Sequence, residues 1–174
     1  MGNKSSQPQY LTDKGSIHLY LPIYDRLFTP YRDREINIFE VGYQYGGSCE
    51  LWGKYFPKAK IKAIDNEIAC SELPILSDRI TLDIIDVKNI TSDYFKDFQP
   101  DIAIDDGSHI LDEQIHFIKT VYPVLKNGGL MILEDIQDID EQTISFRSLG
   151  IHFEIIDLRN INGRYDDVLI IYRK

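Results

Sequence analysis

Two groups of adjacent acids each follow a short apolar run, and their residue types are the ones best suited to chemistry. The first is Asp105-Asp106-Gly107-Ser108-His109, and the second is Glu134-Asp135. Adjacent carboxylates repel one another and lose hydration when partly buried, so such groups usually persist around a cation. Carboxylate oxygens suit a hard divalent metal, and a nearby histidine can act as a general base. The two groups therefore predict a metal site with His109 beside it.

Apolar runs of strand length alternate with segments of helical periodicity along most of the chain. The expected strands are residues 36–41, 60–64, 79–85, 101–104, 130–133, 152–158 and 168–172. The expected helices are residues 48–55, 111–125 and 138–149, after an N-terminal helical pattern formed by Ile17, Leu21, Tyr24 and Phe28. This alternation predicts an α/β fold with a doubly wound, mostly parallel seven-stranded sheet. A short turn at Asn162-Gly163 makes the C-terminal strand antiparallel.

Acids stand at or near the ends of five expected strands. They are Glu40, Asp65, Asp86, Asp106 and Glu134. Open α/β sheets bind their ligands outside the carboxyl ends of the strands, at the point where the strand order reverses. The coincidence of these acids at one edge is stronger evidence for a site than any single motif.

The loop after the first expected strand, Glu40-Val41-Gly42-Tyr43-Gln44-Tyr45-Gly46-Gly47-Ser48, is rich in glycine. Glycines let a backbone pass close to a ligand, and the helix that follows offers free N–H groups at its N-terminus. The spacing does not match the G-x-G-x-x-G dinucleotide motif, and a purely structural turn would look similar. Asp65, at the end of the next strand, is placed to accept hydrogen bonds from ribose hydroxyls. Loop and acid together favour an adenosine-containing cofactor.

Composition bounds the class of protein. The 174 residues suit one domain, expected at residues 12–174 after a flexible polar leader at residues 1–11. The net charge of −9 argues against a nucleic-acid partner, which would need a basic face. Cys49 and Cys70 lack metal-site spacing and are expected to be reduced thiols of a cytoplasmic protein. No apolar run reaches the ~18 residues of a membrane span, so no membrane partner is expected.

Four segments together resemble the class I S-adenosylmethionine-dependent methyltransferases, which have a Rossmann-like fold. They are residues 40–56, 63–65, 105–109 and 125–135. More narrowly, the chain resembles the metal-dependent macrolide-sugar O-methyltransferases of the mycinamicin and macrocin type, and residues 12–20 resemble an N-terminal segment of that group. The resemblance implies S-adenosylmethionine and magnesium or manganese as cofactors. It also implies a hydroxyl of a sugar or glycosylated metabolite as the methyl acceptor, and a homo-oligomer.

The resemblance also implies a role for each matched residue. Those that would bind the cofactor are Glu40, Gly42, Gly46, Gly47, Ser48, Asp65 and Asp86. Asp106, Glu134 and Asp135 would bind the divalent metal, and His109 would be the general base on the acceptor hydroxyl. Asp86 departs from the pattern, because Val87-Lys88 follows it where more polar residues are expected.

Structural roles are open for several of these residues. His109 could cap the helix that starts near Leu111, and Asp135 could cap the turn that follows it. His18 could stack in a lid over the cofactor or lie on a helix face, and Asp105 should point away from its neighbour. Two functions compete with catalysis of methyl transfer: a non-catalytic regulatory module that binds the cofactor, and a related enzyme of different chemistry, such as the cephalosporin hydroxylase-like proteins.

Overall fold

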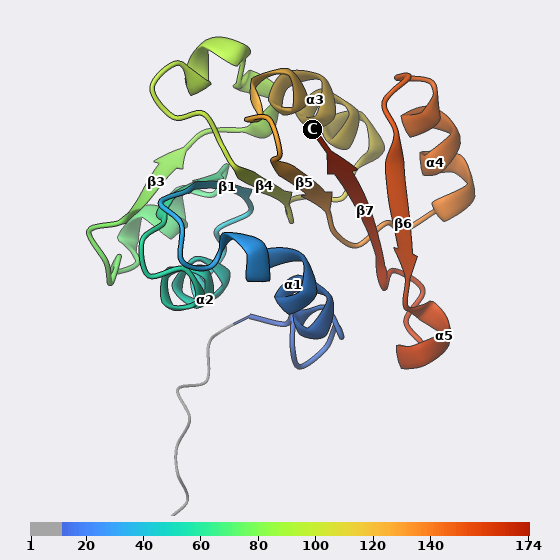
Figure 1. The fold of residues 1–174 in the computed structure, drawn as a ribbon, viewed down its shortest axis with the longest axis horizontal. Helices are drawn as coiled ribbons and strands as arrows, with labels where there is room; N and C mark the ends of the chain where they lie inside the picture. Colours follow the sequence, from blue (N-terminus) through green and yellow to red (C-terminus); the bar gives the residue numbers. More distant parts are fainter. Residues whose placement is uncertain (1–11) are drawn as a thin grey trace, which may run out of the picture.

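Strands and helices alternate along the chain and assemble into one seven-stranded sheet covered on both faces (Figure 1). The structure is a computed structural model that describes residues 12–174, so the expected leader lies outside the described residues. The strands are β1 (Asn37–Val41), β2 (Lys60–Asp65), β3 (Ile80–Ile84), β4 (Ile102–Asp105), β5 (Leu130–Leu133), β6 (Phe153–Asp157) and β7 (Val168–Arg173). The α-helices are α1 (Leu21–Phe28), α2 (Gly47–Tyr55), α3 (Leu111–Val121), α4 (Ile139–Arg147) and α5 (Arg159–Asn162).

The strand order is β3-β2-β1-β4-β5-β7-β6. The first five strands pair in parallel, and β7 is antiparallel to both of its neighbours. The predicted fold class is therefore confirmed, including the single antiparallel C-terminal strand. The order reverses between β1 and β4, where Val41 pairs with Asp105. The carboxyl ends of these two strands mark the expected ligand site.

Side chains that alternate along each strand supply two separate cores, one on each face of the sheet. Ile38 of β1 belongs to the core shared with α1 and α2, where Trp52 is buried. The next residue, Phe39, faces the opposite core and stacks with Phe117 of α3 at 6.3 Å between ring centroids. Both faces are thus sealed by helices, as in Figure 1, where α1 and α2 lie below the sheet and α3 lies above it. The carboxyl ends of the strands stay open to a ligand.

The N-terminal helix starts later than its pattern predicts. The apolar spacing begins at Ile17, but α1 starts at Leu21, with Pro22 in its first turn. Proline fits only the first turn of a helix, because further along it removes a backbone hydrogen bond and clashes with the preceding turn. Residues 13–18 form hydrogen-bonded turns instead, in which the Asp13 carbonyl accepts three backbone N–H groups. The prediction of a helix from Ile17 is wrong, and these turns place side chains where a helix could not.

The connection between the last two strands also differs from the prediction of a short turn. A single helical turn, α5, precedes β7, and Gly163 ends it with a left-handed φ of 77°. Asn162-Gly163 therefore acts as a helix end and not as a two-residue hairpin turn. Among residues 12–174, every helix is too short or too polar to cross a bilayer.

Candidate active site

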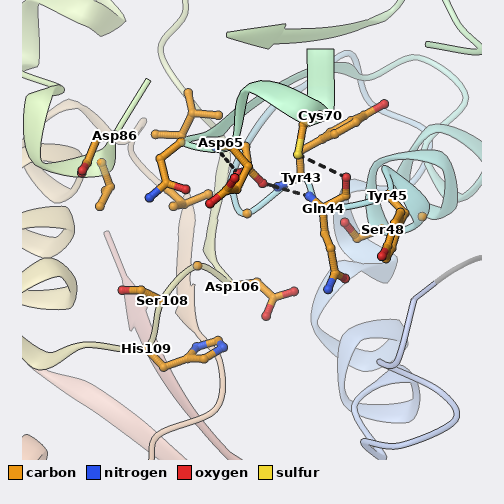
Figure 2. A pocket seen from close by; sticks show the side chains of 18 of the residues that line it. Tyr43, Gln44, Tyr45, Ser48, Asp65, Cys70, Asp86, Asp106, Ser108 and His109 are labelled. Atoms are coloured by element: carbon orange, nitrogen blue, oxygen red, sulfur yellow. Dashed lines mark hydrogen bonds between the residues drawn. The ribbon is translucent and has the colours of Figure 1, made fainter. Parts of the chain in front are cut away.

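A pocket of about 550 Å³ opens at the carboxyl ends of β1, β2 and β4 (Figure 2). Its volume falls in the range of about 300–1,000 Å³ that is usual for small-molecule and cofactor sites. The predicted site residues that line it are Gly42, Gly47, Ser48, Asp65, Asp86, Asp106, His109 and Asp135. Three others, Glu40, Gly46 and Glu134, are not part of its lining. Most of the residues singled out from the sequence thus meet in one cavity.

The glycine-rich loop is shaped by two left-handed glycines. Gly42 has a φ of 92°, and a Cβ added there would lie 2.1 Å from the backbone oxygen of Asp106. Gly46 has a φ of 74° at the start of α2, and its Cβ would lie 2.5 Å from the Tyr43 hydroxyl oxygen. A side chain is excluded at Gly42, so the β1 loop and the β4 loop meet backbone to backbone at the pocket wall.

Asp65 holds the glycine-rich loop in place from the end of β2. Its Oδ2 accepts the backbone N–H groups of Tyr43 at 2.8 Å and Gln44 at 2.9 Å, as Figure 2 shows. Its Oδ1 accepts the N–H of Glu67 at 2.9 Å. A carboxylate has about four acceptor positions, so Asp65 keeps capacity for a ligand hydroxyl. Asp86 lies further along the pocket and accepts the N–H of Lys88 at 2.8 Å.

Glu40 lies beneath the pocket, fully buried behind the glycine-rich loop. It accepts hydrogen bonds from Cys49 Sγ at 3.2 Å and Trp52 Nε1 at 3.3 Å. Burial raises the pKa of Glu40, and the nearby charge of Lys14 opposes that rise. In this position Glu40 can support the loop that a cofactor would contact, but it does not face the cavity itself.

Asp106, His109 and Asp135 come together at the lower rim of the pocket. One ligand atom of each lies within 4.8 Å of the others. His109 and Asp135 both have left-handed backbones, with φ of 60° and 53°. Such strain in residues other than glycine concentrates at functional sites. His109 Nε2 lies 3.8 Å from Asp135 Oδ2, while His109 Nδ1 is buried without a hydrogen-bond partner.

Glu134 points deeper than its neighbour Asp135. Its Oε1 accepts the hydroxyl of Tyr24 at 2.5 Å and Lys14 Nζ at 2.7 Å. Burial and the charge of Asp106 raise the pKa of Glu134 well above its usual range. Asp106 and Asp135 therefore line the pocket with His109, whereas Glu134 contacts Lys14 and Tyr24 of the N-terminal segment.

Lys14 is the site residue that sequence reasoning missed. Its ammonium is completely buried, 2.5 Å from Asp106 Oδ2, 2.7 Å from Glu134 Oε1 and 4.0 Å from Glu40 Oε1. Burial alone would lower the pKa of Lys14, but the three surrounding carboxylates outweigh it and raise that pKa well above its usual range. A lysine between Asp13 and Gly15 looks like a surface residue, so no sequence signal other than the resemblance of residues 12–20 pointed to it.

Residues other than His109 and Asp135 take the helix-capping roles that the sequence left open. The residue at the N-cap of α3 is Ile110, without a side-chain cap, so His109 does not cap that helix. The cap of α4 is Asp138, whose Oδ1 accepts the N–H of Glu141 at 3.0 Å, and Asp135 does not take that role. Asp105 is buried outside the pocket lining, as expected from strand alternation. Neither His109 nor Asp135 therefore serves as a helix cap.

Asp105 should make stability depend on pH. Burial raises its pKa from 3.8 to about 7, the Gly107 N–H opposing the rise and the charge of Asp106 adding to it. The folded state therefore keeps a proton that the unfolded state loses above about pH 4, and stability falls as pH rises from there to about 7. The full cost is about 4 kcal/mol, at ~1.4 kcal/mol per pKa unit. Asparagine avoids the buried charge at this position, although its buried amide also costs free energy. At pH 8.5 the free energy of unfolding of Asp105→Asn should therefore exceed that of wild type by about 2 kcal/mol.

Urea unfolding of wild type and Asp105→Asn between pH 5 and 8.5, in the presence of a chelator, measures this effect. The exposed Asp97→Asn is the matched control and should keep the wild-type pH dependence. Equal pH dependence in Asp105→Asn and wild type would mean that Asp105 is ionised in the folded state.

Comparisons with known proteins agree with the fold and site. No protein-family model matches the chain. Demethylmacrocin O-methyltransferase from Streptomyces fradiae is 31% identical over 169 residues, which cover 86% of this chain and 42% of that protein. Mycinamicin VI 2''-O-methyltransferase from Micromonospora griseorubida is 30% identical over 176 residues, with the same shares covered. The chain therefore spans less than half the length of these relatives.

Among solved structures, the methyltransferase MycE of the mycinamycin biosynthetic pathway superimposes with a TM-score of 0.75. It is 24% identical, and the match covers 95% of this chain and 52% of MycE. That structure is a complex of MycE with Mg and SAH. The chain therefore shares the Rossmann-like fold of this methyltransferase. Its homologues at about 30% identity are macrolide sugar O-methyltransferases, which confirms the resemblance expected from the sequence.

Proposed function

We propose that the protein is an S-adenosylmethionine-dependent O-methyltransferase assisted by magnesium or manganese. The observation that carries the proposal is the group of Asp106, His109 and Asp135, gathered at the rim of the pocket formed by the glycine-rich loop. We propose a sugar hydroxyl or a glycosylated metabolite as the acceptor, because the relatives are named for methylation of macrolide or rhamnosyl compounds.

The pocket fits the proposed cofactor. The backbone around Gly42 leaves no room for a Cβ, so this wall of the pocket presents backbone peptide groups to a ligand in place of side chains. Asp65 and Asp86 line the same cavity and can accept hydroxyl or amino hydrogens of a nucleoside. MycE, whose fold this chain shares, was solved with SAH.

The rim of the pocket fits a divalent ion. Asp106 and Asp135 supply the carboxylate oxygens that magnesium and manganese prefer. Magnesium's preference for oxygen leaves the His109 imidazole for proton transfer. We therefore propose Asp106 and Asp135 as the residues that hold the ion, and we assign Glu134 to supporting this end through Lys14 and Tyr24.

The chain's own residues then act as follows. When bound, the cofactor supplies the methyl group and the ion supplies positive charge beside the acceptor hydroxyl. The His109 imidazole, which lines the pocket, accepts the hydroxyl proton. Asp135 Oδ2 lies 3.8 Å from His109 Nε2 and stabilises the charge that the imidazole gains. The glycine-rich loop and the β4 loop hold both reactants in one cavity, which provides orientation.

Calorimetric titration of S-adenosylmethionine and S-adenosylhomocysteine, with and without magnesium, tests the proposal. We expect both to bind with micromolar affinity. Binding would justify a screen of glycosylated acceptors for methyl transfer. If neither compound binds under either condition, the methyltransferase proposal is wrong, and the pocket serves a different ligand.

We also propose a class of acceptor, a cellular location and an oligomeric state. The net charge of −9 supports a small-molecule acceptor over nucleic acid. Both cysteines are buried free thiols, which supports a reducing cytoplasmic location. The expected homo-oligomer is testable by light scattering of the purified protein.

A further inference from the structure

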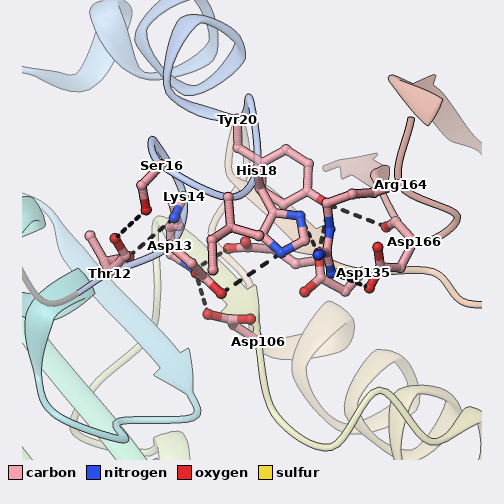
Figure 3. Close-up of polar contacts among 12 residues, drawn as sticks. Thr12, Asp13, Lys14, Ser16, His18, Tyr20, Asp106, Asp135, Arg164 and Asp166 are labelled. Carbon is pink, nitrogen blue, oxygen red and sulfur yellow. Dashed lines mark hydrogen bonds and ion pairs between the residues drawn. The ribbon is translucent and has the colours of Figure 1, made fainter. Parts of the chain in front are cut away.

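Each of the three predicted metal-binding carboxylates accepts a hydrogen bond from one short N-terminal segment, residues 14–24. Lys14 Nζ donates to Asp106 and Glu134, at 2.5 and 2.7 Å. The Tyr24 hydroxyl donates to Glu134 Oε1 at 2.5 Å, and the Tyr20 hydroxyl donates to Asp135 Oδ1 at 2.6 Å. These donors come from the turns before α1 and from α1 itself, outside the sheet that carries the acids. Figure 3 shows Lys14 and Tyr20 beside Asp106 and Asp135.

The donors leave one oxygen of each carboxylate for another partner. Tyr20 takes Oδ1 of Asp135, while Oδ2 faces His109. Lys14 takes Oδ2 of Asp106, and it shares Oε1 of Glu134 with Tyr24. A carboxylate held through one oxygen presents its other oxygen to an ion in a defined orientation. Donors that fix metal ligands in this way are a recurrent requirement of metal sites.

The two tyrosines are held firmly by their surroundings. Tyr20 is fully buried and Tyr24 is 2% exposed. The Tyr24 ring packs against Phe28 and Trp52, with centroids 4.8 and 5.1 Å apart. The ring of His18 stacks on Tyr20 at 4.9 Å, and its Nδ1 is 2.5 Å from the buried Asp167 Oδ1. His18 therefore braces this segment and does not lie on a helix face, since α1 starts only at Leu21. Its role in a lid over the cofactor stays a prediction.

We propose that Lys14, Tyr20 and Tyr24 are positioning residues for a divalent ion, so that residues 14–24 form part of the metal site. This inference rests on the proposed function, since it assumes that an ion binds at Asp106 and Asp135. It goes further because it assigns the orientation of the carboxylates to a segment outside the sheet. Removing a single hydroxyl should lower the affinity for the ion without disturbing the cofactor pocket.

Tyr20→Phe removes only the hydroxyl that orients Asp135. We expect it to bind Mn²⁺, measured by electron paramagnetic resonance, about 10- to 100-fold more weakly than wild type. Its affinity for S-adenosylhomocysteine without metal should stay unchanged. Tyr31→Phe is the matched control, because this buried tyrosine donates to the Gly128 carbonyl away from the pocket, and it should keep wild-type Mn²⁺ affinity.

The outcomes separate this inference from the proposed function. If wild type binds no Mn²⁺, the metal-assisted function fails first. If wild type binds Mn²⁺ and Tyr20→Phe binds it equally well, the inference alone is wrong. Should Tyr20→Phe fail to fold, Tyr24→Phe provides the second test, because the Tyr24 hydroxyl orients Glu134, which holds the Lys14 ammonium that donates to Asp106. Unchanged Mn²⁺ affinity in Tyr24→Phe would overturn the inference.

Discussion

Lys14→Met should destabilise the protein by about 3–5 kcal/mol, the usual cost of leaving buried charges without their partner. The ammonium is the positive charge that contacts three carboxylates at once, those of Glu40, Asp106 and Glu134. Methionine fills a similar volume but leaves the three carboxylates without a positive partner, and two of them, Glu40 and Glu134, are buried. Urea unfolding at pH 7.5 in the presence of a chelator, followed by circular dichroism, measures the change in the free energy of unfolding.

Lys96→Met provides the control for this substitution. Lys96 pairs with Asp93 at 3.2 Å on the surface, with both side chains mostly exposed. Such pairs contribute about 0–1 kcal/mol, so this variant should unfold almost like wild type. The deficit of Lys14→Met should shrink at low pH, because protonated carboxylates no longer need the ammonium. A deficit below about 1 kcal/mol at pH 7.5 would show that the acids are not held as an ionised cluster.

The strand ends show most clearly how much of the site can be predicted from the sequence. Parallel pairing brings the ends of β1, β2 and β4 to one edge, so Asp65 and Asp106 could be placed together from strand boundaries alone. The same logic could not separate Glu134 from Asp135. Backbone direction after β5 changes at Asp135, whose left-handed φ of 53° turns it to the pocket while Glu134 stays inside. Local dihedral angles of this kind follow from tertiary contacts and leave no periodic trace.

The place of Lys14 in the site could not be predicted from the sequence either. Its contacts with Asp106 and Glu134 join residues 92 and 120 positions apart in the chain. The side chain leaves a turn whose form depends on Pro22 delaying the helix, so hydrophobic periodicity misplaced this region. The acids alone suggested a cation at their centre, and the protein supplies one of its own. Part of the charge that the sequence assigned to a metal is therefore balanced by a residue.

His109→Ala should lower methyl transfer by about 10²- to 10⁴-fold, the range typical for loss of a general base. It should leave the affinities for S-adenosylhomocysteine and Mn²⁺ close to wild type, because we assign the ion to carboxylate oxygens. The measurement combines single-turnover transfer from labelled S-adenosylmethionine, with an acceptor found by screening, and the two binding titrations. The exposed His152→Ala serves as the control and should behave like wild type in all three.

The pattern of losses decides between the roles open to His109. Loss of turnover with intact Mn²⁺ binding identifies a base, whereas parallel loss of both would make His109 the third ligand of the group with Asp106 and Asp135. Unchanged turnover would contradict both roles. The structure favours the base, because the imidazole lines the pocket and the left-handed backbone at residue 109 holds it at the pocket rim. A left-handed backbone at a residue other than glycine costs free energy, which fits a side chain that must be held in place for the reaction.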